Sequence, residues 1–446
     1  MAHYGGSIRI DPARCEGDMA CMRVCPTEAI RVRGGKARII ESRCVDCGEC
    51  IRVCQPRAIS PVTDSFADLS RFEYKVALVS PVLYGQFGPG MMPERVLAAL
   101  EKAGFDCACD LTLACECINA AIERFVRNHH GPRPLISCFC PTVVRLIQVR
   151  YPELIEMILP IESPKETLAR EIRKSKARDL RLAEDRIGLI YLTPCPAKML
   201  DVIGHPGKEK SDIDGVIAIS DIYRTVLSLL AISGKRESTE RTQLSGVGMN
   251  WAILGGQTAF LKRENCLAVE GLRNVIRILN DIEMGKLRDC DYVELQSCPD
   301  GCVSGCLLVE NPYVARARVL EILGRLGERP RQSERELVEF CEKGEYFVDR
   351  KLSAQLPGPL DSDVGRAIAK IRRFEEIRQS LPNINCGACG APSCTAFADD
   401  VVREEAGLTD CVFIALQSAG WRIHSGDPKV RQVSSVETNS TMGLRN

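Results

Sequence analysis

Short apolar runs alternate with amphipathic segments through the middle of the chain, from Phe72 to about Leu326. The apolar runs have the length and β-branched content of buried strands, and we expect strands at residues 74–80, 134–137, 187–192, 215–219 and 292–295. Helical spacing follows several of them, at 93–103, up to Arg150 and up to Leu230. Strands that alternate with helices predict an α/β domain with a mostly parallel sheet.

Cysteines follow three of these expected strands. Cys140 comes after the strand near 134–137, Cys195 after 187–192, and Cys298 and Cys302 after 292–295. In a parallel sheet, ligands bind beyond the carboxyl ends of the strands. We therefore predict that these four thiolates converge on one cluster.

Cysteine is also the most unusual part of the composition, with 24 cysteines in 446 residues. Basic and acidic residues balance at 59 each, so nothing favours a nucleic-acid partner. The longest apolar stretches, such as 226–232, are too short to span a membrane, and residues 1–11 show no export leader, so we expect a cytoplasmic protein. Disulfides are rare there, and closely spaced cysteines with only five histidines favour iron–sulfur clusters or zinc.

The N-terminal segment carries a specific cluster motif. Cys44, Cys47, Cys50 and Cys54 form a C-x2-C-x2-C-x3-C run, in which three thiolates hold one cluster and the fourth reaches a second. A near-copy lies 29 residues earlier as Cys15, Asp18, Cys21 and Cys25 followed by Pro26, and strands are expected at 29–32 and 37–40. This repeat resembles the bacterial two-cluster ferredoxins.

The ferredoxin resemblance implies the ligand sets. One cluster takes Cys44, Cys47, Cys50 and Cys25, and the other takes Cys15, Cys21 and Cys54 with Asp18 as the candidate fourth ligand. The alternatives are that Asp18 binds nothing and the site holds three irons, or that the module binds structural zinc.

The three loops with strand-end cysteines resemble the three signature loops of iron-only hydrogenases. The first, Ser137-Cys138-Phe139-Cys140-Pro141, is similar to Thr-Ser-Cys-Cys-Pro of the family. The second, 193–198, is similar to Met-Pro-Cys-x-x-Lys, and the third, 294–302, to Glu-x-Met-x-Cys-x-x-x-Cys. The resemblance covers about 74–318 and implies that Cys140, Cys195, Cys298 and Cys302 hold a four-iron cluster.

The same resemblance implies the rest of an H-cluster. Cys302 would bridge the four-iron cluster to a diiron unit that carries carbon monoxide, cyanide and a dithiol bridge. Lys198 would donate hydrogen bonds to a cyanide, and Ser80 and Pro81 would line the dithiol bridge. The alternative for Lys198 is a solvated loop lysine.

Several positions depart from the family pattern. Phe139 stands where active members have a cysteine that donates protons, so a slow enzyme is expected, with Cys138 or Cys306 as substitutes. Slow turnover suits a hydrogen sensor better than a metabolic enzyme. Further departures are Gln296 and Thr193 for methionine, Leu159 for serine, Asp201 for glutamate, Lys165 for glutamine, and Cys306 among the glycines after the third loop.

Other cysteines have no assigned cluster. Two C-x-C pairs occur close together, and metal binding and ordinary burial are both open for them, with burial favoured. The same interpretation applies to three isolated cysteines. These residues are Cys107, Cys109, Cys115, Cys117, Cys266, Cys290 and Cys341.

A glycine-rich cysteine motif marks the C-terminal part. Cys386, Cys389, Cys394 and Cys411 follow C-x2-C-x4-C-x16-C and resemble a small four-iron module, with zinc as the alternative. Helices are expected at 336–348, 367–379 and 395–405.

We therefore expect a two-cluster ferredoxin-like α+β domain at 1–65, an α/β hydrogenase H-cluster domain at 66–330, a helical connector at 331–380, and a C-terminal iron–sulfur domain with its tail at 381–446. The cofactors would be three 4Fe-4S clusters plus the H-cluster. The expected activity is slow, reversible hydrogen oxidation, with H2 and protons, a ferredoxin or other redox protein, maturation enzymes and a separate signalling protein as partners. Two alternatives remain: a non-enzymatic electron-transfer or cluster-assembly factor without the diiron unit, and a subunit of a bifurcating complex.

Overall fold

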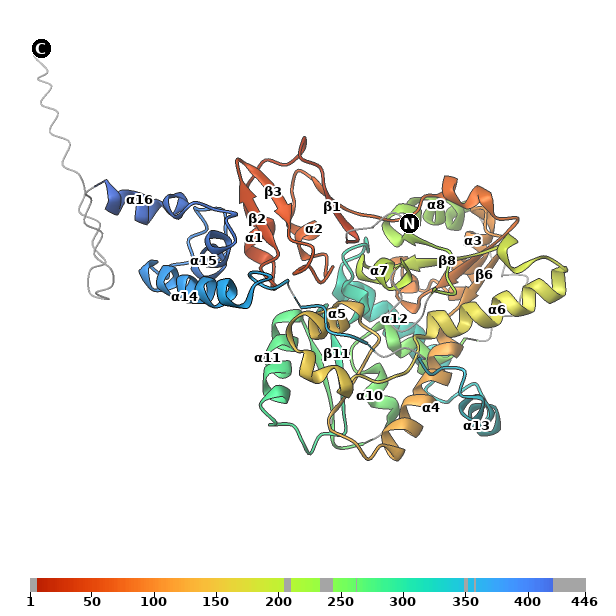
Figure 1. Ribbon diagram of the computed structural model, residues 1–446. Coiled ribbons are helices and arrows are strands. Elements are labelled where there is room, and N and C mark those ends of the chain that lie inside the picture. Colours follow the sequence, from red (N-terminus) through yellow and green to blue (C-terminus); the bar gives the residue numbers. More distant parts are fainter. Residues whose placement is uncertain are drawn as a thin grey trace, which may run out of the picture. The chain divides into compact units, whose positions relative to one another are not determined.

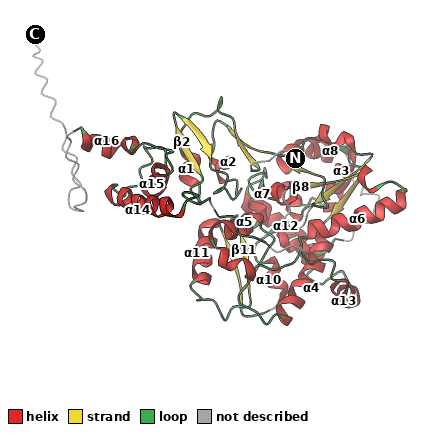
Figure 2. Ribbon diagram, in the orientation of Figure 1, coloured by secondary structure: helices red, strands yellow, loops and turns green. Residues whose placement is uncertain are grey.

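The structure is a computed structural model that describes residues 6–203, 210–232, 244–261, 263–348, 352–356 and 358–419. The chain divides into two compact units, Met1–Gly358 and Pro359–Asn446, which are described separately below. Figure 1 labels the elements, and Figure 2 shows helices gathered around short strands. Among the described residues, no helix combines the length and apolarity needed to cross a membrane.

A four-stranded parallel sheet forms one half of the central domain. Its strand order is β6-β5-β8-β9, and all neighbouring pairs are parallel. The predicted α/β class is therefore confirmed. The strands are β5 (Tyr74–Val79), β6 (Cys107–Asp110), β8 (Ile187–Thr193) and β9 (Gly215–Ala218).

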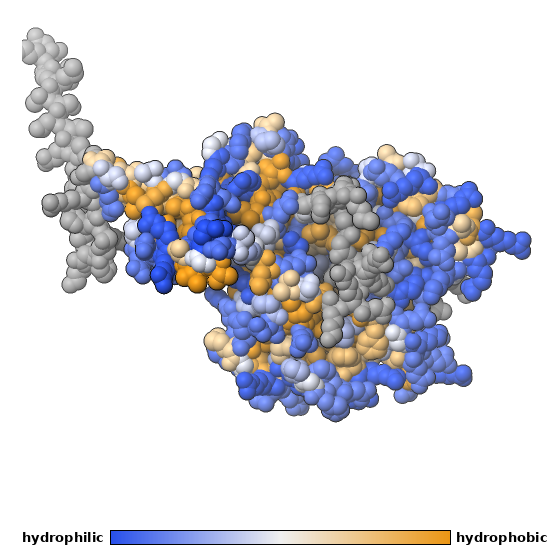
Figure 3. Space-filling view, in the orientation of Figure 1, coloured by the Kyte–Doolittle hydropathy of each residue, from blue (hydrophilic) through white to orange (hydrophobic). Residues whose placement is uncertain are grey.

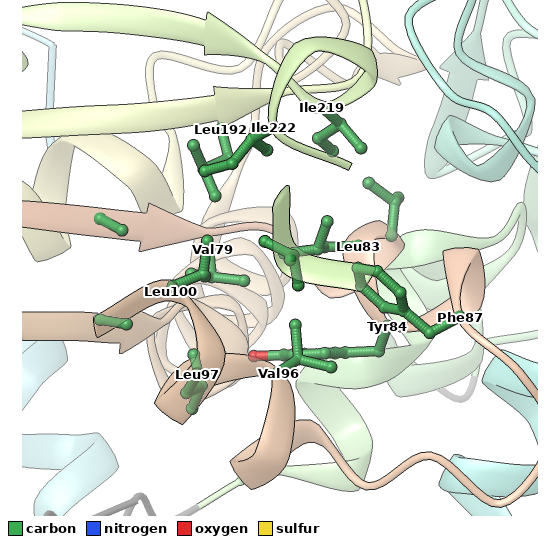
Figure 4. Close-up of a cluster of buried hydrophobic side chains, with 14 of the residues drawn as sticks. Val79, Leu83, Tyr84, Phe87, Val96, Leu97, Leu100, Leu192, Ile219 and Ile222 are labelled. Carbon is green, nitrogen blue, oxygen red and sulfur yellow. The ribbon is translucent and has the colours of Figure 1, made fainter. Parts of the chain in front are cut away.

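Alternating side chains of this sheet pack against helices on both faces. On one face, Val79 and Leu192 pack with Leu97 of α3 (Pro93–Lys102) and Ile222 of α8 (Ile219–Ile232), as Figure 4 shows. On the other face, strand residues such as Val76 and Leu189 pack with α4 (Thr112–Asn128) and α6 (Pro164–Leu180). Because both faces are covered, the strands are continuous apolar runs.

A second, smaller parallel sheet has the order β10-β11-β7. It consists of β7 (Leu135–Ile136), β10 (Cys266–Glu270) and β11 (Tyr292–Gln296). Helices α5 (Pro141–Arg150) and α11 (Leu272–Glu283) pack on it through one apolar cluster. The central domain thus contains two parallel sheets rather than the single sheet expected from the sequence.

The N-terminal segment forms a small α+β module. Strand β1 (Ile8–Ile10) pairs antiparallel with β4 (Ile59–Pro61), and β2 (Ile30–Arg33) pairs antiparallel with β3 (Lys36–Ile39). The two expected strands are β2 and β3, and each half also contains one short helix. These helices are α1 (Ala20–Val24) and α2 (Glu49–Val53).

The remaining helices of the first unit complete the central domain. Helix α13 ends at Lys343, before the expected end near Val348, because Gly344 adopts a positive φ of 64° that terminates a helix. These helices are α7 (Ala197–Ile203), α9 (Gly246–Met249), α10 (Gly256–Leu261), α12 (Pro312–Leu326) and α13 (Glu334–Lys343). Polar side chains cover much of the visible face, with smaller hydrophobic areas between them (Figure 3).

The second unit has its own apolar core. Helices α14 (Val364–Ser380), α15 (Cys394–Val402) and α16 (Val412–Ser418) surround a cluster that includes Ile377 and Phe397. The two expected helices at 367–379 and 395–405 correspond to α14 and α15.

Candidate active site

The carboxyl ends of four parallel strands, from both sheets, meet at one cavity of about 60 Å³. Ser80 and Pro81 follow β5, Cys140 follows β7, Lys198 lies in the first turn of α7 after β8, and Cys302 follows β11. The other residues that line the cavity are Leu111, Cys115, Ser137, Phe139, Ser163, Pro164, Lys165, Tyr191, Trp251, Gln257, Leu295 and Gln296.

The four strand-end cysteines lie close together, and two of them, Cys140 and Cys302, line this cavity. The Cys140 thiol donates to Ser297 Oγ at 3.4 Å, and Ser297 Oγ lies 3.9 Å from Cys298 Sγ. Burial raises the pKa of the thiols of Cys195, Cys298 and Cys302, and other members of the set raise each pKa further. These three buried thiols thus need a bound cationic centre to become thiolates, which is the donor chemistry of an iron–sulfur cluster.

The spacing of the thiols also bears on the kind of metal. A single tetrahedral zinc ion requires sulfur atoms roughly 3.8 Å apart, given Zn–S bonds of about 2.3 Å. Among the described residues, the set of three potential ligands within 4.8 Å of one another is Glu162, Glu166 and Asp212, and no set of three cysteines is that close. The spacing of the cysteines in the sequence motifs, rather than these sulfur distances, is what indicates iron–sulfur clusters.

Lys198 lies within the cavity wall and faces the cysteine set. Its Nζ is 5.7 Å from the centroid of the Tyr191 ring. Burial alone lowers the pKa of this ammonium, but Tyr191, Cys302, Cys195 and Cys140 raise it, and the pKa lies well above its usual range. The lysine is therefore a fixed positive charge beside the thiols, which is the placement that a buried anionic ligand requires.

Two backbone features shape the loops that carry the cysteines. Thr193 Oγ1 donates to the carbonyl of Cys195 at 2.7 Å and accepts from its amide at 3.3 Å, so this threonine closes the turn before the ligand. Gly301 has a φ of 87°, and a Cβ there would lie 2.6 Å from the Leu254 nitrogen, so glycine is required before Cys302.

The third loop is further fixed by Glu294. Its carboxylate accepts from the amides of Gly255, Gln257 and Thr258 at 3.1 Å each, and from Gln296 Nε2 at 2.8 Å. Gln296 therefore anchors to the loop glutamate and at the same time lines the cavity.

The chain is similar to proteins of a known family. The family model of the iron only hydrogenase large subunit, C-terminal domain, matches residues 73–256 and 224–306, which together exceed half of the chain. The chain belongs to the iron-only hydrogenase family. A 4Fe-4S dicluster domain model matches residues 7–55, and an Fe-S cluster model matches 381–413.

Individual relatives are distant. Iron hydrogenase 1 of Clostridium pasteurianum is 22% identical over 256 residues, which span 47% of this chain and 44% of that enzyme. A variant of the hydrogenase HydA1 from Chlamydomonas reinhardtii superposes with a TM-score of 0.50 at 14% identity, covering 65% of this chain and 98% of that one. A second variant of the same protein gives 0.50 at 15% identity, with 66% and 97% covered. These structural likenesses support the hydrogenase fold.

The cavity of about 60 Å³ that Cys140, Cys302 and Lys198 line is called the hydrogenase cavity below. The two cysteines proposed as substitute proton donors are not among its lining residues. The Cys138 thiol donates to the Ile161 carbonyl at 3.0 Å and lines a neighbouring, larger cavity. Cys306 packs against the ferredoxin-like module: a Cβ at Gly48 would approach Cys306 Sγ to 2.2 Å. Phe139 does line the hydrogenase cavity, but its side chain carries no transferable proton.

Both predicted ligand sets of the ferredoxin-like module come together. Cys15, Asp18, Cys21 and Cys54 line one small cavity, and Asp18 Oδ1 accepts from the Ala20 amide at 3.0 Å. Burial raises the pKa of the Cys50 thiol, and the thiols of Cys44 and Cys25 raise it further, so these three thiols lie near one another. Burial also raises the pKa of the Cys47 thiol, and Cys50, Cys25 and Cys44 raise it further.

Backbone amides point at several of these sulfur atoms. Ala37 donates to Cys15 Sγ at 3.3 Å, and Ala58 donates to Cys54 Sγ at 3.2 Å. Equivalent contacts from Ala29 to Cys25 and from Asp46 to Cys44 measure 3.2 and 3.4 Å. Such amides stabilise thiolates around an iron–sulfur cluster.

The second unit brings its four motif cysteines to one small cavity. Cys386, Cys389, Cys394 and Cys411 all line it, together with Gly387. The Cys394 amide donates to Asn385 Oδ1 at 2.8 Å, which ties the start of α15 to the loop that carries Cys386.

Several residues of the hydrogenase cavity were not anticipated from the sequence. Cys115 is buried, as favoured for the C-x-C pairs, but also lines this cavity from α4, and Tyr191 and Trp251 line it from β8 and the segment after α9. The remaining unassigned cysteines do not line this cavity: Cys107 and Cys109 lie on β6 with sulfur atoms 3.6 Å apart, Cys290 and Cys341 are buried, and Cys117 and Cys266 are partly buried.

Proposed function

We propose that this chain is a slow hydrogenase that oxidises H2 reversibly at a diiron–cubane H-cluster and serves hydrogen sensing. The observation that carries the proposal is that Cys140, Cys195, Cys298 and Cys302 lie near one another beside one cavity, which Cys140, Cys302 and Lys198 line. Four thiolates suit a cubane, and the remaining space beside Cys302 suits the two further irons. When bound, the H-cluster supplies the chemistry that splits H2 and stores its electrons.

The residues of the chain hold and enclose that group. Cys302 lines the cavity and, as the family resemblance implies, would be the ligand shared with the diiron unit. Lys198 offers an ammonium for a cyanide, and Ser80 and Pro81 form the wall that would face the dithiol bridge. Tyr191, which is fully buried, keeps Lys198 in position from β8.

Phe139 supports the low turnover. An aromatic ring in the cavity wall excludes water and cannot exchange protons, whereas a well-placed acid–base group contributes about 10²- to 10⁴-fold in rate. A slow enzyme that still binds H2 suits a sensor, and its output would pass to a separate signalling protein.

The ferredoxin-like module supports an electron exit on its side of the cavity. Arg52 of α2 donates to the carbonyl of Ser304, in the loop that follows Cys302. Cys306 from that loop lies against Gly48, between Cys47 and Cys50 in sequence. Close packing of the two cluster-bearing loops favours electron transfer between them, with a ferredoxin or another redox protein as the external partner.

A second candidate is an electron-transfer or cluster-assembly factor that holds the cubane alone. Phe139 and Gln296 favour it, because both line the cavity and both replace family residues. Lys198 favours the hydrogenase, since a cubane alone gives a buried ammonium no cyanide to bind.

Infrared spectroscopy separates the two candidates. The full chain would be produced together with the hydrogenase maturation enzymes, and its spectrum compared with that of the Cys302→Ser variant, in which the bridging thiolate is removed. The proposal predicts stretching bands of iron-bound carbon monoxide and cyanide in the wild type and their loss in the variant. Fully matured wild type without these bands would favour the second candidate.

A further inference from the structure

A second cavity adjoins the hydrogenase cavity. Its volume is about 840 Å³, and it shares two wall residues, Phe139 and Ser163, with the smaller cavity. Much of its lining is apolar, including Leu159 and Ile161. The titratable residues that line it are His129, Cys138, Glu156, Glu162 and Asp201.

One ion pair crosses the wall between the two cavities. Lys165 lines the hydrogenase cavity, Asp201 lines the larger one, and Lys165 Nζ lies 2.6 Å from Asp201 Oδ2. Their side chains are 4% and 12% exposed. Both residues depart from the family pattern, and the structure shows that the two departures contact each other.

Glu166, Lys198 and Cys138 are other titratable neighbours of the pair. Glu166 Oε1 lies 3.2 Å from Lys165 Nζ but also accepts from Ser211 Oγ at 2.7 Å, and its Oε2 accepts from the Asp212 amide at 2.8 Å. Glu166 is thus bound to the segment before β9 and lines neither cavity. Lys198 is a nearby like charge that lowers the pKa of Lys165, and Asp201 raises the pKa of the Cys138 thiol.

We propose that Lys165 and Asp201 form a proton relay between the hydrogenase cavity and the larger cavity, in place of the donor that is missing at Phe139. The inference rests on the proposed hydrogenase function and names the proton route of that site. In hydrogen oxidation, an N–H bond of Lys165 breaks as an O–H bond forms on Asp201, and Lys165 Nζ takes up the proton that leaves the site. Asp201 then passes its proton to water in the larger cavity, and hydrogen formation runs the same transfers in reverse.

The electrostatics of the pair explain why such a relay would be slow. Burial alone lowers the pKa of Lys165, but Asp201 and Glu166 outweigh it, and the pKa is raised above its usual value. The neutral amine is therefore a rare state, and each transfer must pass through it. A short hydrogen bond makes the transfer possible, while the stability of the ion pair limits its frequency.

Variants at both positions test the relay in the full, matured chain. Lys165→Gln and Asp201→Asn each remove one proton-carrying group, and the double variant removes both charges of the pair together. Asp201→Glu retains a carboxylate, and Glu156→Gln is a matched control that changes a carboxylate of the larger cavity outside the pair.

Two readouts are needed. The first is the rate of H2 formation at saturating reductant, which we expect to fall roughly 10²-fold in Lys165→Gln, Asp201→Asn and the double variant, and to change less than twofold in Glu156→Gln. The second is an infrared difference spectrum between the reduced and oxidised protein. We expect a band of the Asp201 carboxylate that differs between the two states, shifts in D2O because its Lys165 donor exchanges, is absent in Asp201→Asn and persists in Asp201→Glu.

The outcomes distinguish the relay from the function on which it rests. Wild type without carbonyl and cyanide bands would overturn the hydrogenase function itself. Normal carbonyl and cyanide bands in every variant, with unchanged rates and an unchanged carboxyl signal, would overturn the relay alone. A rate loss in Lys165→Gln that Phe139→Cys restores, in the same chain, would support the relay, because a structural defect would not be repaired by a new proton donor.

Discussion

The rings of Phe139 and Trp251 meet edge to face, with their centroids 4.8 Å apart. A hydrogen bond fixes the Trp251 ring, because its indole Nε1 donates to Asn119 Oδ1 at 2.9 Å. Both rings line the hydrogenase cavity, and Phe139 also lines the larger one. The aromatic pair therefore forms the wall at the position where active members of the family carry a proton-donating thiol.

Replacing that ring by a thiol should speed up the enzyme. We predict that Phe139→Cys raises the rate of H2 formation by about 10²-fold, within the range of acid–base catalysis, because a transferable proton then enters the cavity wall. The measurement is H2 production by the matured chain at saturating reductant. Phe139→Ala is the matched control, since it opens the same space without a donor, and an equal gain in both variants would contradict the explanation.

Removing the ammonium of Lys198 should prevent retention of the diiron unit. We predict that Lys198→Met, after maturation, lacks the carbonyl and cyanide bands but keeps the visible absorption of its 4Fe-4S clusters, because the cubane ligands are untouched. Lys176→Met is the control, since Lys176 of α6 lies over the ring of Tyr74 of β5 and does not line the cavity. Full-intensity bands in Lys198→Met would show that the lysine is not a cyanide donor.

A cysteine at position 18 should change the cluster that Cys15, Cys21 and Cys54 would hold in the ferredoxin-like module. Asp18 lines the same small cavity as Cys15, Cys21 and Cys54, and a carboxylate binds iron less tightly than a thiolate does. We predict that Asp18→Cys alters the electron paramagnetic resonance signal of that cluster and makes it more resistant to chelators. Asp18→Asn retains the acceptor for the Ala20 amide and serves as the control. Identical spectra for wild type and Asp18→Cys would mean that Asp18 is not a ligand.

Asp110 should make the stability of the central domain depend on pH. Burial raises the pKa of its carboxyl to about 6, although hydrogen bonds from Thr112 and Tyr84 lower it. Because the folded state binds this proton more tightly than the unfolded state, the contribution is greatest in acid and is lost as pH rises through about 6.

The expected size of that loss can be measured. Between pH 5.5 and 7.5 the free energy of unfolding should fall by about 1 kcal/mol on account of Asp110. Anaerobic denaturant titrations at the two pH values would show this decline, and it should be smaller in Asp110→Asn, which keeps an acceptor for the Thr112 amide and has an NH2 group that can donate to the Tyr84 oxygen. An equal decline in the variant would assign the pH dependence to other groups.

Most of the central fold could be predicted from apolar periodicity, because strands such as β5 and β8 are buried on both faces and therefore continuous in sequence. Strand β6 was missed because Cys107–Asp110 lacks the branched residues that mark a strand, and its pairing with β5 supplies the missing preference. The division into two sheets also could not be predicted, since local patterns do not specify which strands pair.

The candidate site shows the same limit. Cys140, Cys195, Cys298 and Cys302 could be grouped from their places after strands, and the structure brings them together. The contact between Lys165 and Asp201 could not be found, because each residue alone looks like the loss of a family feature. Only the tertiary arrangement of α6 and α7 makes them one ion pair.

The central claim is that Cys140, Cys195, Cys298 and Cys302 share one metal centre, and the most direct test is anaerobic diffraction from crystals of the matured chain at the iron absorption edge. The account predicts anomalous density for a four-iron cluster among these sulfur atoms, with two further irons next to Cys302 and beside Lys198. Density at separate single-metal sites, or none among the four thiols, would contradict it.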